Sequence, residues 1–349
     1  MFDSVCLIQR KYRSMSQQDA PELFRYFLEG LIHGEEQILK SQGKFVKNPP
    51  NITYKLIQTP VERIFGNYQA HRVECLECDY KSWTFHFSID INLDIDKEEV
   101  WRMREKFVEE KKIAAQKVVQ REKGLRENSV NGHYQLTATY WNAQEDPAPY
   151  VDANKDKLFC PAPNYKESQS SNDETAQLTN LLDDYFHREI LNDQENYYSC
   201  VKCRKKDEGK KKDYFGKTDP KFITKTFFLY NPSPVLVIVL KRFKKTNSYS
   251  WMSSGGFTKI DTEVQFPFDL DMTKYFIKQN NPSETFKYTL HGIVVHGGGL
   301  GGGHYTAYAK HIIEGKERWF YASDSYVNEV DKGQVARAQA YMLFYSRVN

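Results

Sequence analysis

The sequence predicts an α+β protein, with helices early in the chain and strands in its second half. Apolar residues recur at helical spacing within residues 17–40, which predicts an amphipathic helix. Apolar and polar residues alternate over residues 61–96, and strand-sized apolar segments follow one another from residue 231 onward. The sequence contains no internal repeat.

The first helix is expected to begin at Asp19, a good N-cap residue, and Glu22 three positions later completes the pattern of a capping box. Residues 41–60 contain Pro49-Pro50 and are predicted to form a loop. The apolar stripe of the helix consists of Leu23, Phe24, Phe27, Leu28, Leu31 and Ile32.

The middle of the chain divides into three parts. Residues 61–96 predict two or three strands. Residues 97–175 are charged at first and then polar and rich in proline, which predicts a charged, partly disordered insertion. A second helix is predicted at about residues 179–191.

Strands dominate the second half of the chain. Two of them are predicted to form a hairpin that turns at Glu314-Gly315-Lys316. The predicted strands cover residues 235–243, 260–268, 288–296, 305–313, 318–322 and 341–346.

Four of the six cysteines form two C-x-x-C pairs. Cys75 and Cys78 fall at a turn between predicted strands, and Cys200 and Cys203 follow the second helix. Four thiolates satisfy a tetrahedral Zn²⁺ ion and leave no open position, so the two pairs predict a structural zinc site. The alternative is that one or both pairs are surface thiols without metal. Cys160, within the polar insertion, is interpreted as an incidental thiol.

A glycine-rich segment ends at a candidate catalytic histidine. Six of the seven residues 297–303 are glycine, and His304 follows at the start of a predicted strand. A histidine at the rigid end of a strand suits a general base, which needs a partner for its other ring nitrogen. The predicted hairpin returns Ser323 and Asp324 to the neighbourhood of His304. The alternative is a surface histidine on a flexible loop, and His296 is interpreted as structural.

Charge and hydropathy exclude several classes of protein. The chain carries 49 basic and 46 acidic residues, a net charge of +3, which argues against a dedicated nucleic-acid binder and against a polybasic membrane anchor. No apolar run is long enough to span a bilayer, and the first residues lack the pattern of a secretory signal. We therefore expect an intracellular protein, nuclear or cytoplasmic or both.

Several segments together resemble the ubiquitin-specific protease family of deubiquitinases, and they occur in the family's order over residues 17–345. One departure is Pro21, which replaces the usual polar residue of the first segment. The segments are Gln17-Gln18-Asp19-Ala20-Pro21-Glu22-Leu23, the approach from Phe186 to Cys203, Pro234 to Phe243, Phe266-Pro267, Gly303-His304-Tyr305-Thr306-Ala307-Tyr308, and Trp319 to Val327.

The resemblance implies a papain-like cysteine protease of the thumb, palm and fingers type, with the N-terminal part of the thumb missing. Residues 1–60 would be a remnant of the thumb. Residues 61–96 and 176–230 would form the fingers with their zinc knuckles, residues 97–175 the insertion, and residues 231–349 the palm with its histidine box.

The resemblance also implies the chemistry: thiol-dependent hydrolysis of isopeptide bonds at the ubiquitin C-terminus. The partners would be ubiquitin, whose Leu-Arg-Gly-Gly tail would thread a narrow channel, and ubiquitinated proteins. His304 would be the general base. The family's third catalytic position is an Asp or Asn four residues after the tryptophan, which here is Ser323, and Asp324 follows, so either residue is a candidate for orienting the histidine.

The family's nucleophile lies in an Asn-Thr-Cys-Phe-like box upstream of Gln17, whereas no cysteine of this chain precedes an aromatic residue. The chain as given is therefore expected to be inactive alone. A truncated piece of an active enzyme is the favoured explanation, because Met1 falls inside the family domain. The alternative is a catalytically dead ubiquitin-binding protein. A third interpretation is a zinc-ribbon protein that binds nucleic acid through Lys202–Lys212 and Lys241–Lys245.

Overall fold

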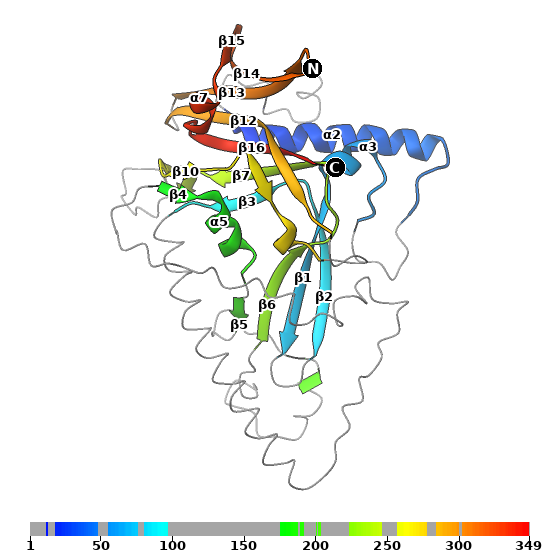
Figure 1. Ribbon diagram of the computed structural model, residues 1–349. Coiled ribbons are helices and arrows are strands. Elements are labelled where there is room, and N and C mark those ends of the chain that lie inside the picture. The colour runs from blue at the N-terminus through cyan, green and yellow to red at the C-terminus, as the bar shows by residue number, and fades with distance from the viewer. Residues whose placement is uncertain are drawn as a thin grey trace, which may run out of the picture.

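Two sheets dominate the structure, and Figure 1 shows the larger one at the top of the molecule and a narrower one extending below it. The chain has 349 residues. The computed structural model describes Tyr12 and residues 18–47, 55–75, 80–96, 175–187, 189–191, 200, 202–203, 223–245, 257–277, 284–299 and 302–348.

The larger sheet has eight strands in the order β15-β14-β13-β12-β16-β7-β3, with β11 also paired to β12. All pairs are antiparallel except β3 with β7. The strands are β3 (Ile91–Asp94), β7 (Val235–Lys241), β11 (Asp269–Asp271), β12 (Lys287–Gly299), β13 (Gly302–Ile313), β14 (Lys316–Ser323), β15 (Tyr326–Val330) and β16 (Ala340–Arg347).

Strand β7, between β16 and the edge strand β3, is buried on both faces, which explains its continuous apolar sequence. Successive side chains of a strand point to opposite faces, so β7 contributes to two separate clusters. Helix α5 (Leu178–Tyr185) packs into the first of these clusters. Leu236, Ile238 and Leu240 belong to that first cluster, and Val237 and Val239 belong to the second.

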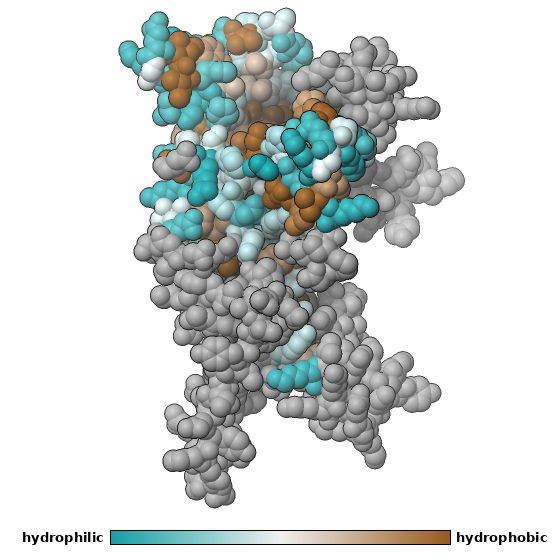
Figure 2. Space-filling view, turned by 90° about the vertical axis from the view of Figure 1, so that its right-hand side faces the viewer, coloured by the Kyte–Doolittle hydropathy of each residue, from teal (hydrophilic) through white to brown (hydrophobic). Residues whose placement is uncertain are grey.

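The second face of the sheet is covered by α2 (Ala20–Ser41), the helix that the apolar stripe predicted. Phe24 of α2 packs edge-to-face on Phe344 of β16, with ring centroids 5.4 Å apart. The stripe is buried only in part, because Leu23 and Leu31 remain 38% and 41% exposed. Figure 2 views the side on which α2 ends and shows apolar patches between hydrophilic ones.

The predicted capping box of this helix is wrong. Asp19 occupies the N-cap position of α2, but its side chain makes no capping hydrogen bond. The carboxylate instead accepts a hydrogen bond from the hydroxyl of Tyr341, at 2.5 Å. A contact between residues so far apart in the chain prevails here over the local capping pattern.

A short helix, α3 (Pro60–Phe65), stands where the alternating pattern predicted the start of a strand. Thr59 and Glu62 form a complete capping box at its beginning, and Pro60 occupies its first turn. The second predicted helix is also shorter than expected, since α5 ends at Tyr185 and β5 (Glu189–Leu191) follows.

The narrower sheet has the strand order β2-β1-β6-β5. Its long strands are β1 (Asn67–Cys75), β2 (Lys81–Ser88) and β6 (Ile223–Leu229), and β1 pairs antiparallel with both neighbours. The predicted strands over the later part of residues 61–96 are thus confirmed, with β3 as the third.

The predicted strand at residues 260–268 is wrong in its extent, because this region forms β9 (Phe257–Lys259) and β10 (Glu263–Gln265) before β11. Strand β9 pairs with β8 (Phe243–Lys245), and β10 pairs with β4 (Thr175–Gln177). The interruption at residues 260–262 has a local cause, since Ile260 and Thr262 use their carbonyls to bind Arg242.

The hairpin predicted to turn at Glu314-Gly315-Lys316 is confirmed. Strands β13 and β14 turn at Glu314-Gly315, both in the left-handed region with φ of 51° and 74°. After β15, the helix α7 (Lys332–Ala336) leads to β16.

Several predictions lie outside the described residues, namely those for Cys6, Cys78, Cys160 and residues 97–174. Among the helices that the structure describes, none is long and apolar enough to cross a membrane.

Candidate active site and metal centre

The glycine-rich segment forms the end of the β12–β13 hairpin. The two strands remain paired as far as Gly299 and Gly302, and Gly297 lies opposite His304. Gly298 has a φ of 84°, and a Cβ atom there would lie 2.6 Å from the carbonyl oxygen of Gly302. Gly298 therefore cannot carry a side chain in this hairpin without displacing its partner strand.

His304 lies beside both residues that the sequence analysis nominated as its partners. Its Nε2 is 2.7 Å from the hydroxyl oxygen of Ser323 and 3.8 Å from Oδ2 of Asp324. The pairing of β13 with β14 explains this proximity, because Ala307 lies opposite Ala322 and brings the ends of the two strands together. Asp324 begins the turn after β14 with a φ of 49°.

The geometry distinguishes the two candidate partners. Ser323 is within hydrogen-bond distance of Nε2, whereas Asp324 is beyond it and acts on the ring only through its charge. Because Nε2 is engaged, Nδ1 is the nitrogen left to exchange a proton with another group. The side chains of His304 and Asp324 are 51% and 84% exposed, so their attraction is screened by water.

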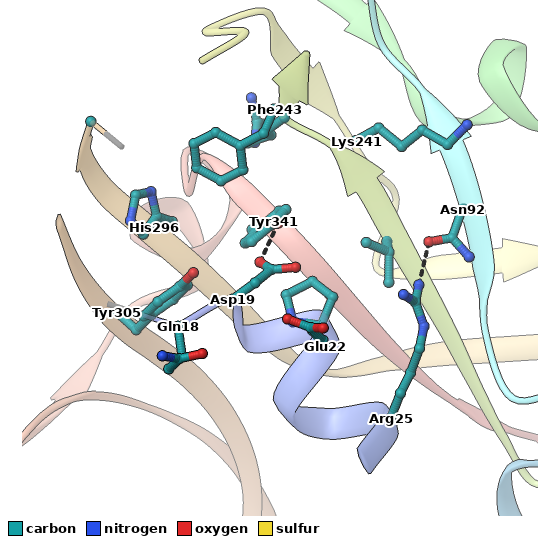
Figure 3. Close-up of a pocket in the computed structure, with 14 residues that line it drawn as sticks. Gln18, Asp19, Glu22, Arg25, Asn92, Lys241, Phe243, His296, Tyr305 and Tyr341 are labelled. Atoms are coloured by element: carbon teal, nitrogen blue, oxygen red, sulfur yellow. Dashed lines mark hydrogen bonds between the residues drawn. The ribbon is translucent and has the colours of Figure 1, made fainter. Parts of the chain in front are cut away.

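A pocket of about 440 Å³ lies next to this hairpin, between the start of α2 and strands β7, β12, β13 and β16 (Figure 3). Asp19 and Glu22 line it at the start of α2, the cations Arg25, Lys241 and Arg242 line it as well, and aromatic rings line it where the strands converge. The strand residues that line it include Phe243, His296, Gly299, Tyr305 and Tyr341.

Hydrogen bonds fix the wall between α2 and the strands. Tyr341 donates to the carboxylate of Asp19, and the backbone N–H of Ala20 donates to the hydroxyl of Tyr305 at 3.3 Å. Burial, followed by the bond to Asp19, raises the pKa of Tyr341 well above its usual range. Both tyrosines are therefore neutral donors or acceptors near neutral pH.

His296 belongs to this pocket, although the sequence analysis interpreted it as structural. The residue is 4% exposed, and its ring lies against the rings of Tyr305 and Phe243, with centroids 4.7 and 5.4 Å away. Burial, followed by the charge of Lys259, lowers the pKa of His296. One signal could have placed it: a hairpin centred between residues 300 and 301 puts His296 opposite Tyr305.

A second polar cluster adjoins the pocket. Arg25 of α2 donates to Oδ2 of Asp90 at 2.6 Å and to Oδ1 of Asn92 at 2.5 Å. Two lysines at and after the end of β7 are likewise partnered, since Lys241 lies 3.8 Å from Asp94 and Lys244 pairs with Asp96. The charge of these two lysines is thus offset locally.

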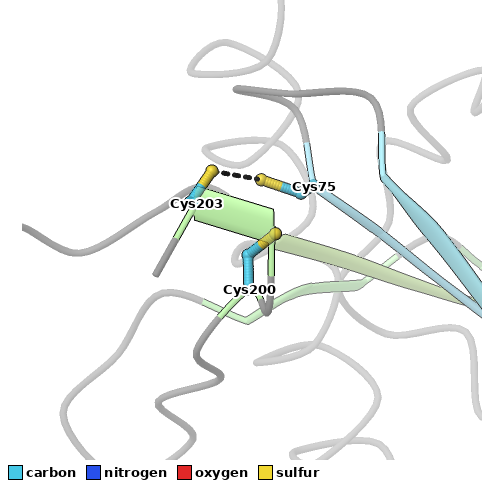
Figure 4. Close-up of side chains that lie close together, drawn as sticks. All are labelled: Cys75, Cys200 and Cys203. Carbon is cyan, nitrogen blue, oxygen red and sulfur yellow. Dashed lines mark hydrogen bonds between the residues drawn. The ribbon is translucent and has the colours of Figure 1, made fainter. Parts of the chain in front are cut away.

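Three of the four predicted metal ligands come together at the far end of the narrower sheet (Figure 4). The sulfur atoms of Cys75, Cys200 and Cys203 lie within 4.8 Å of one another, and all three residues are buried. Cys75 and Cys203 have their sulfur atoms 3.7 Å apart. A tetrahedral site with Zn–S bonds of about 2.3 Å requires sulfur atoms about 3.8 Å apart, and the separation of Cys75 and Cys203 matches this value, so the cluster could hold a metal ion.

The mixed α/β fold is that of solved deubiquitinase structures. One is the SAGA DUB module of Ubp8, Sgf11, Sus1 and Sgf73 bound to monoubiquitin: the match covers 99% of this chain and 52% of that chain at 20% identity, with a TM-score of 0.58. The same module bound to ubiquitin aldehyde matches with the same TM-score of 0.58 and the same coverage.

The chain belongs to the ubiquitin carboxyl-terminal hydrolase family, whose model matches residues 1–345. Human ubiquitin carboxyl-terminal hydrolase 3 is 28% identical over 366 residues, which cover 99% of this chain and 51% of the relative. Ubiquitin carboxyl-terminal hydrolase 12 of Saccharomyces cerevisiae is 34% identical over 182 residues, 52% of this chain and 12% of the relative. The chain thus spans about half the length, or less, of these curated relatives.

Proposed function

We propose that this chain binds ubiquitin and carries the proton-accepting half of a thiol-dependent site that hydrolyses bonds at the ubiquitin C-terminus. The observation that carries the proposal is the contact between His304 and Ser323, 2.7 Å apart, at the end of a glycine-rich hairpin and next to a pocket. Family membership supports the same reaction class.

In this proposal His304 accepts the proton of a thiol at Nδ1 and later returns it to the leaving amine. Ser323 holds the ring at Nε2, and Asp324 stabilises the imidazolium through its charge at 3.8 Å. Serine orients the ring without supplying charge, so the two residues together would replace the single carboxylate of the usual catalytic triad.

The pocket is proposed to receive the ubiquitin tail. Asp19 and Glu22 supply negative charge for the tail's arginine, and the rings of Phe243, Tyr305 and Tyr341 supply an apolar wall for its leucine. Tyr305 follows His304 directly on β13, so the two side chains lie on opposite faces of the strand. A tail that ends in two glycines can cross between these faces beside Gly297 and Gly303, which have no side chains.

Cys75, Cys200 and Cys203, together with Cys78, which lies outside the described residues, are proposed to hold a structural zinc ion. The ion would tie β1 to the segment that precedes β6. The narrower sheet would then be the fingers of the domain, and the larger sheet its palm.

The nucleophile is the part of the site that this sequence does not supply. No cysteine of the chain precedes an aromatic residue, and the three described cysteines share the metal-type cluster. We therefore propose that the chain alone binds ubiquitin without hydrolysing it, as expected either for part of an active enzyme or for a catalytically dead binding protein.

Calorimetric titration with ubiquitin tests this proposal, with fluorogenic ubiquitin hydrolysis as the parallel assay. We expect binding without turnover, and Glu22→Lys should weaken binding at least about tenfold by placing a cation where the tail arginine lies. Glu314→Lys changes the same charge on an exposed turn and should bind as wild type does. Turnover by the wild-type chain, or equal binding by the two variants, would contradict the proposal.

A further inference from the structure

The end of the glycine hairpin extends beyond the strand that flanks it. Strand β16 accompanies β12 only as far as the pair Val295 and Ala340. Alternate residues of a strand direct their carbonyls to the same edge, so the carbonyls of His296 and Gly298 share one edge of β12. Beyond Ala340 no described strand lies along that edge to supply their hydrogen bonds.

Lys259 supplies those hydrogen bonds. Its ammonium donates to the carbonyl oxygen of His296 at 2.9 Å and to that of Gly298 at 3.0 Å. The third polar group in reach is the carboxylate of Asp261 at 3.8 Å, which is 73% exposed. The Lys259 side chain is itself only 12% exposed; its bond to His296 is partly buried, and its bond to Gly298 lies at the surface.

Strand pairing and hydrogen bonds from Arg242 hold the segment that contains Lys259 in place. Lys259 lies opposite Phe243 in the β8–β9 pair. Next to Phe243, the fully buried Arg242 donates from Nη1 to the carbonyls of Ile260 and Thr262 at 3.1 and 3.0 Å, and from Nε to Ala340 at 2.6 Å. Arg242 thus connects the segment that contains Lys259 to the first residue of β16, Ala340. Ala340 is also the last residue of β16 that pairs with β12 before the hairpin end.

We propose that Lys259 is a positioning residue, which takes the place of a missing strand and holds the glycine hairpin, and with it His304, in the arrangement that the ubiquitin tail requires. Only the link to the ubiquitin tail rests on the proposed function. The two bonds from Lys259 to the carbonyls of the hairpin are present whatever the hairpin binds.

The hairpin has reason to need such a support. Six of the seven residues at its end are glycines without side chains that could pack, and glycine loses more backbone freedom on ordering than any other residue. His304 pairs with Gly297, which lies between the two carbonyls that Lys259 binds. If β12 becomes more mobile at Gly297, the paired residue His304 on β13 therefore becomes more mobile as well.

Three variants separate this role from general stability. Lys259→Met removes the charge and all donors at similar length, Lys259→Gln keeps one donor group, and Lys259→Arg keeps both donors and charge. Lys316→Met is the matched control, since Lys316 is an exposed lysine of β14, in the sheet that contains the glycine hairpin. Amide hydrogen exchange is measured at residues 297–299 and 302–304. Calorimetry then compares intact ubiquitin with ubiquitin that lacks its last four residues.

Lys259→Met is expected to exchange about tenfold faster at the hairpin and to bind intact ubiquitin about tenfold more weakly, with unchanged binding of the trimmed form. Lys259→Gln should lie between Lys259→Met and wild type, and Lys259→Arg should restore both quantities. Unchanged exchange at the hairpin in Lys259→Met, or equal weakening toward both forms of ubiquitin, would overturn the inference. A wild-type chain that binds no ubiquitin would instead overturn the proposed function, and the exchange rates would still decide the role of Lys259.

Discussion

The carboxylate of Asp19 and the hydroxyl of Tyr341 lie 2.5 Å apart and join the first turn of α2 to the start of the last strand, β16. An N-cap side chain ordinarily accepts a hydrogen bond from a backbone N–H of its own helix, but the Asp19 carboxylate accepts one from Tyr341 instead. It therefore fixes the position of α2 against the sheet, at the wall of the pocket that we assign to the ubiquitin tail.

The bond between Asp19 and Tyr341 should be measurable by a double-mutant cycle. Asp19→Ala and Tyr341→Phe should each destabilise the protein, with a coupling free energy of about 1–2 kcal/mol, because the acceptor is charged. Urea unfolding of the wild type, both single variants and the double variant supplies the four free energies. Strict additivity of the two substitutions would show that the contact contributes nothing to stability.

The secondary structure was predictable where its cause is local. Residues close together in the sequence determine both the apolar stripe of α2 and the hairpin around Glu314-Gly315, and both predictions were confirmed. Helix α3 was missed although Thr59 and Glu62 carry the spacing of a capping box. The alternation of apolar residues in this segment also fits a strand, and it predicts no helix.

The site was predictable where a hairpin register places its residues. That register brings His304 to Ser323 and Asp324, because β13 and β14 are adjacent in sequence and in space. Lys259 and Tyr341 were not recognised as site residues, since each reaches the pocket or the hairpin through contacts between segments far apart in the chain. No periodicity in the sequence encodes such contacts.

Two neighbouring glycines of the hairpin should respond very differently to alanine. A Cβ atom at Gly303 would lie 2.2 Å from Nε2 of His296 and 2.7 Å from the carbonyl of Gly297, whereas one at Gly302 meets nothing within 4 Å. Gly303→Ala should therefore cost about 1–3 kcal/mol of stability through overpacking. Gly302→Ala should stay within about 0.5 kcal/mol of wild type. Thermal unfolding of the two variants makes the comparison, and equal melting temperatures would refute the close approach of Gly303 to His296.

The roles of Ser323 and Asp324 can be separated by the ¹⁵N chemical shifts of the His304 ring. Ser323→Ala removes the group 2.7 Å from Nε2 and should shift the Nε2 resonance strongly. Asp324→Asn alters a group 3.8 Å away and should shift it less, and asparagine tolerates the φ of 49° at this position. A larger shift from Asp324→Asn than from Ser323→Ala would reverse the assignment of the orienting residue.

The thiol cluster should bind about one zinc ion per chain, as measured by elemental analysis of the purified protein. Cys200→Ser should abolish that zinc, because serine does not replace a buried thiolate ligand. At a free zinc concentration 100 times the dissociation constant, loss of the ion should lower stability by about 2.7 kcal/mol. Cys160→Ser serves as the control and should retain the zinc. If Cys200→Ser kept its full zinc content, Cys200 would not be a zinc ligand and the cluster would not be the metal site.

The last prediction concerns His71 of β1, whose ring lies against those of His86 and Phe227, with centroids 4.3 and 4.4 Å away. Burial, followed by the charges of His86 and Lys225, lowers the pKa of His71 from 6.5 to about 4. Between these two values the unfolded chain binds the proton and the folded chain does not, so protonation favours unfolding.

The contribution of His71 to stability should thus be fully present above about pH 6.5 and should be lost progressively as the pH falls toward 4. His71→Gln keeps a polar side chain that does not titrate in this range. Urea unfolding at pH 7 and at pH 5 should show a larger loss for the wild type than for His71→Gln. The buried His296, whose pKa is also lowered, acts in both proteins and cancels in the comparison. Equal losses in the two proteins would mean that the His71 ring is accessible to protons in the folded state.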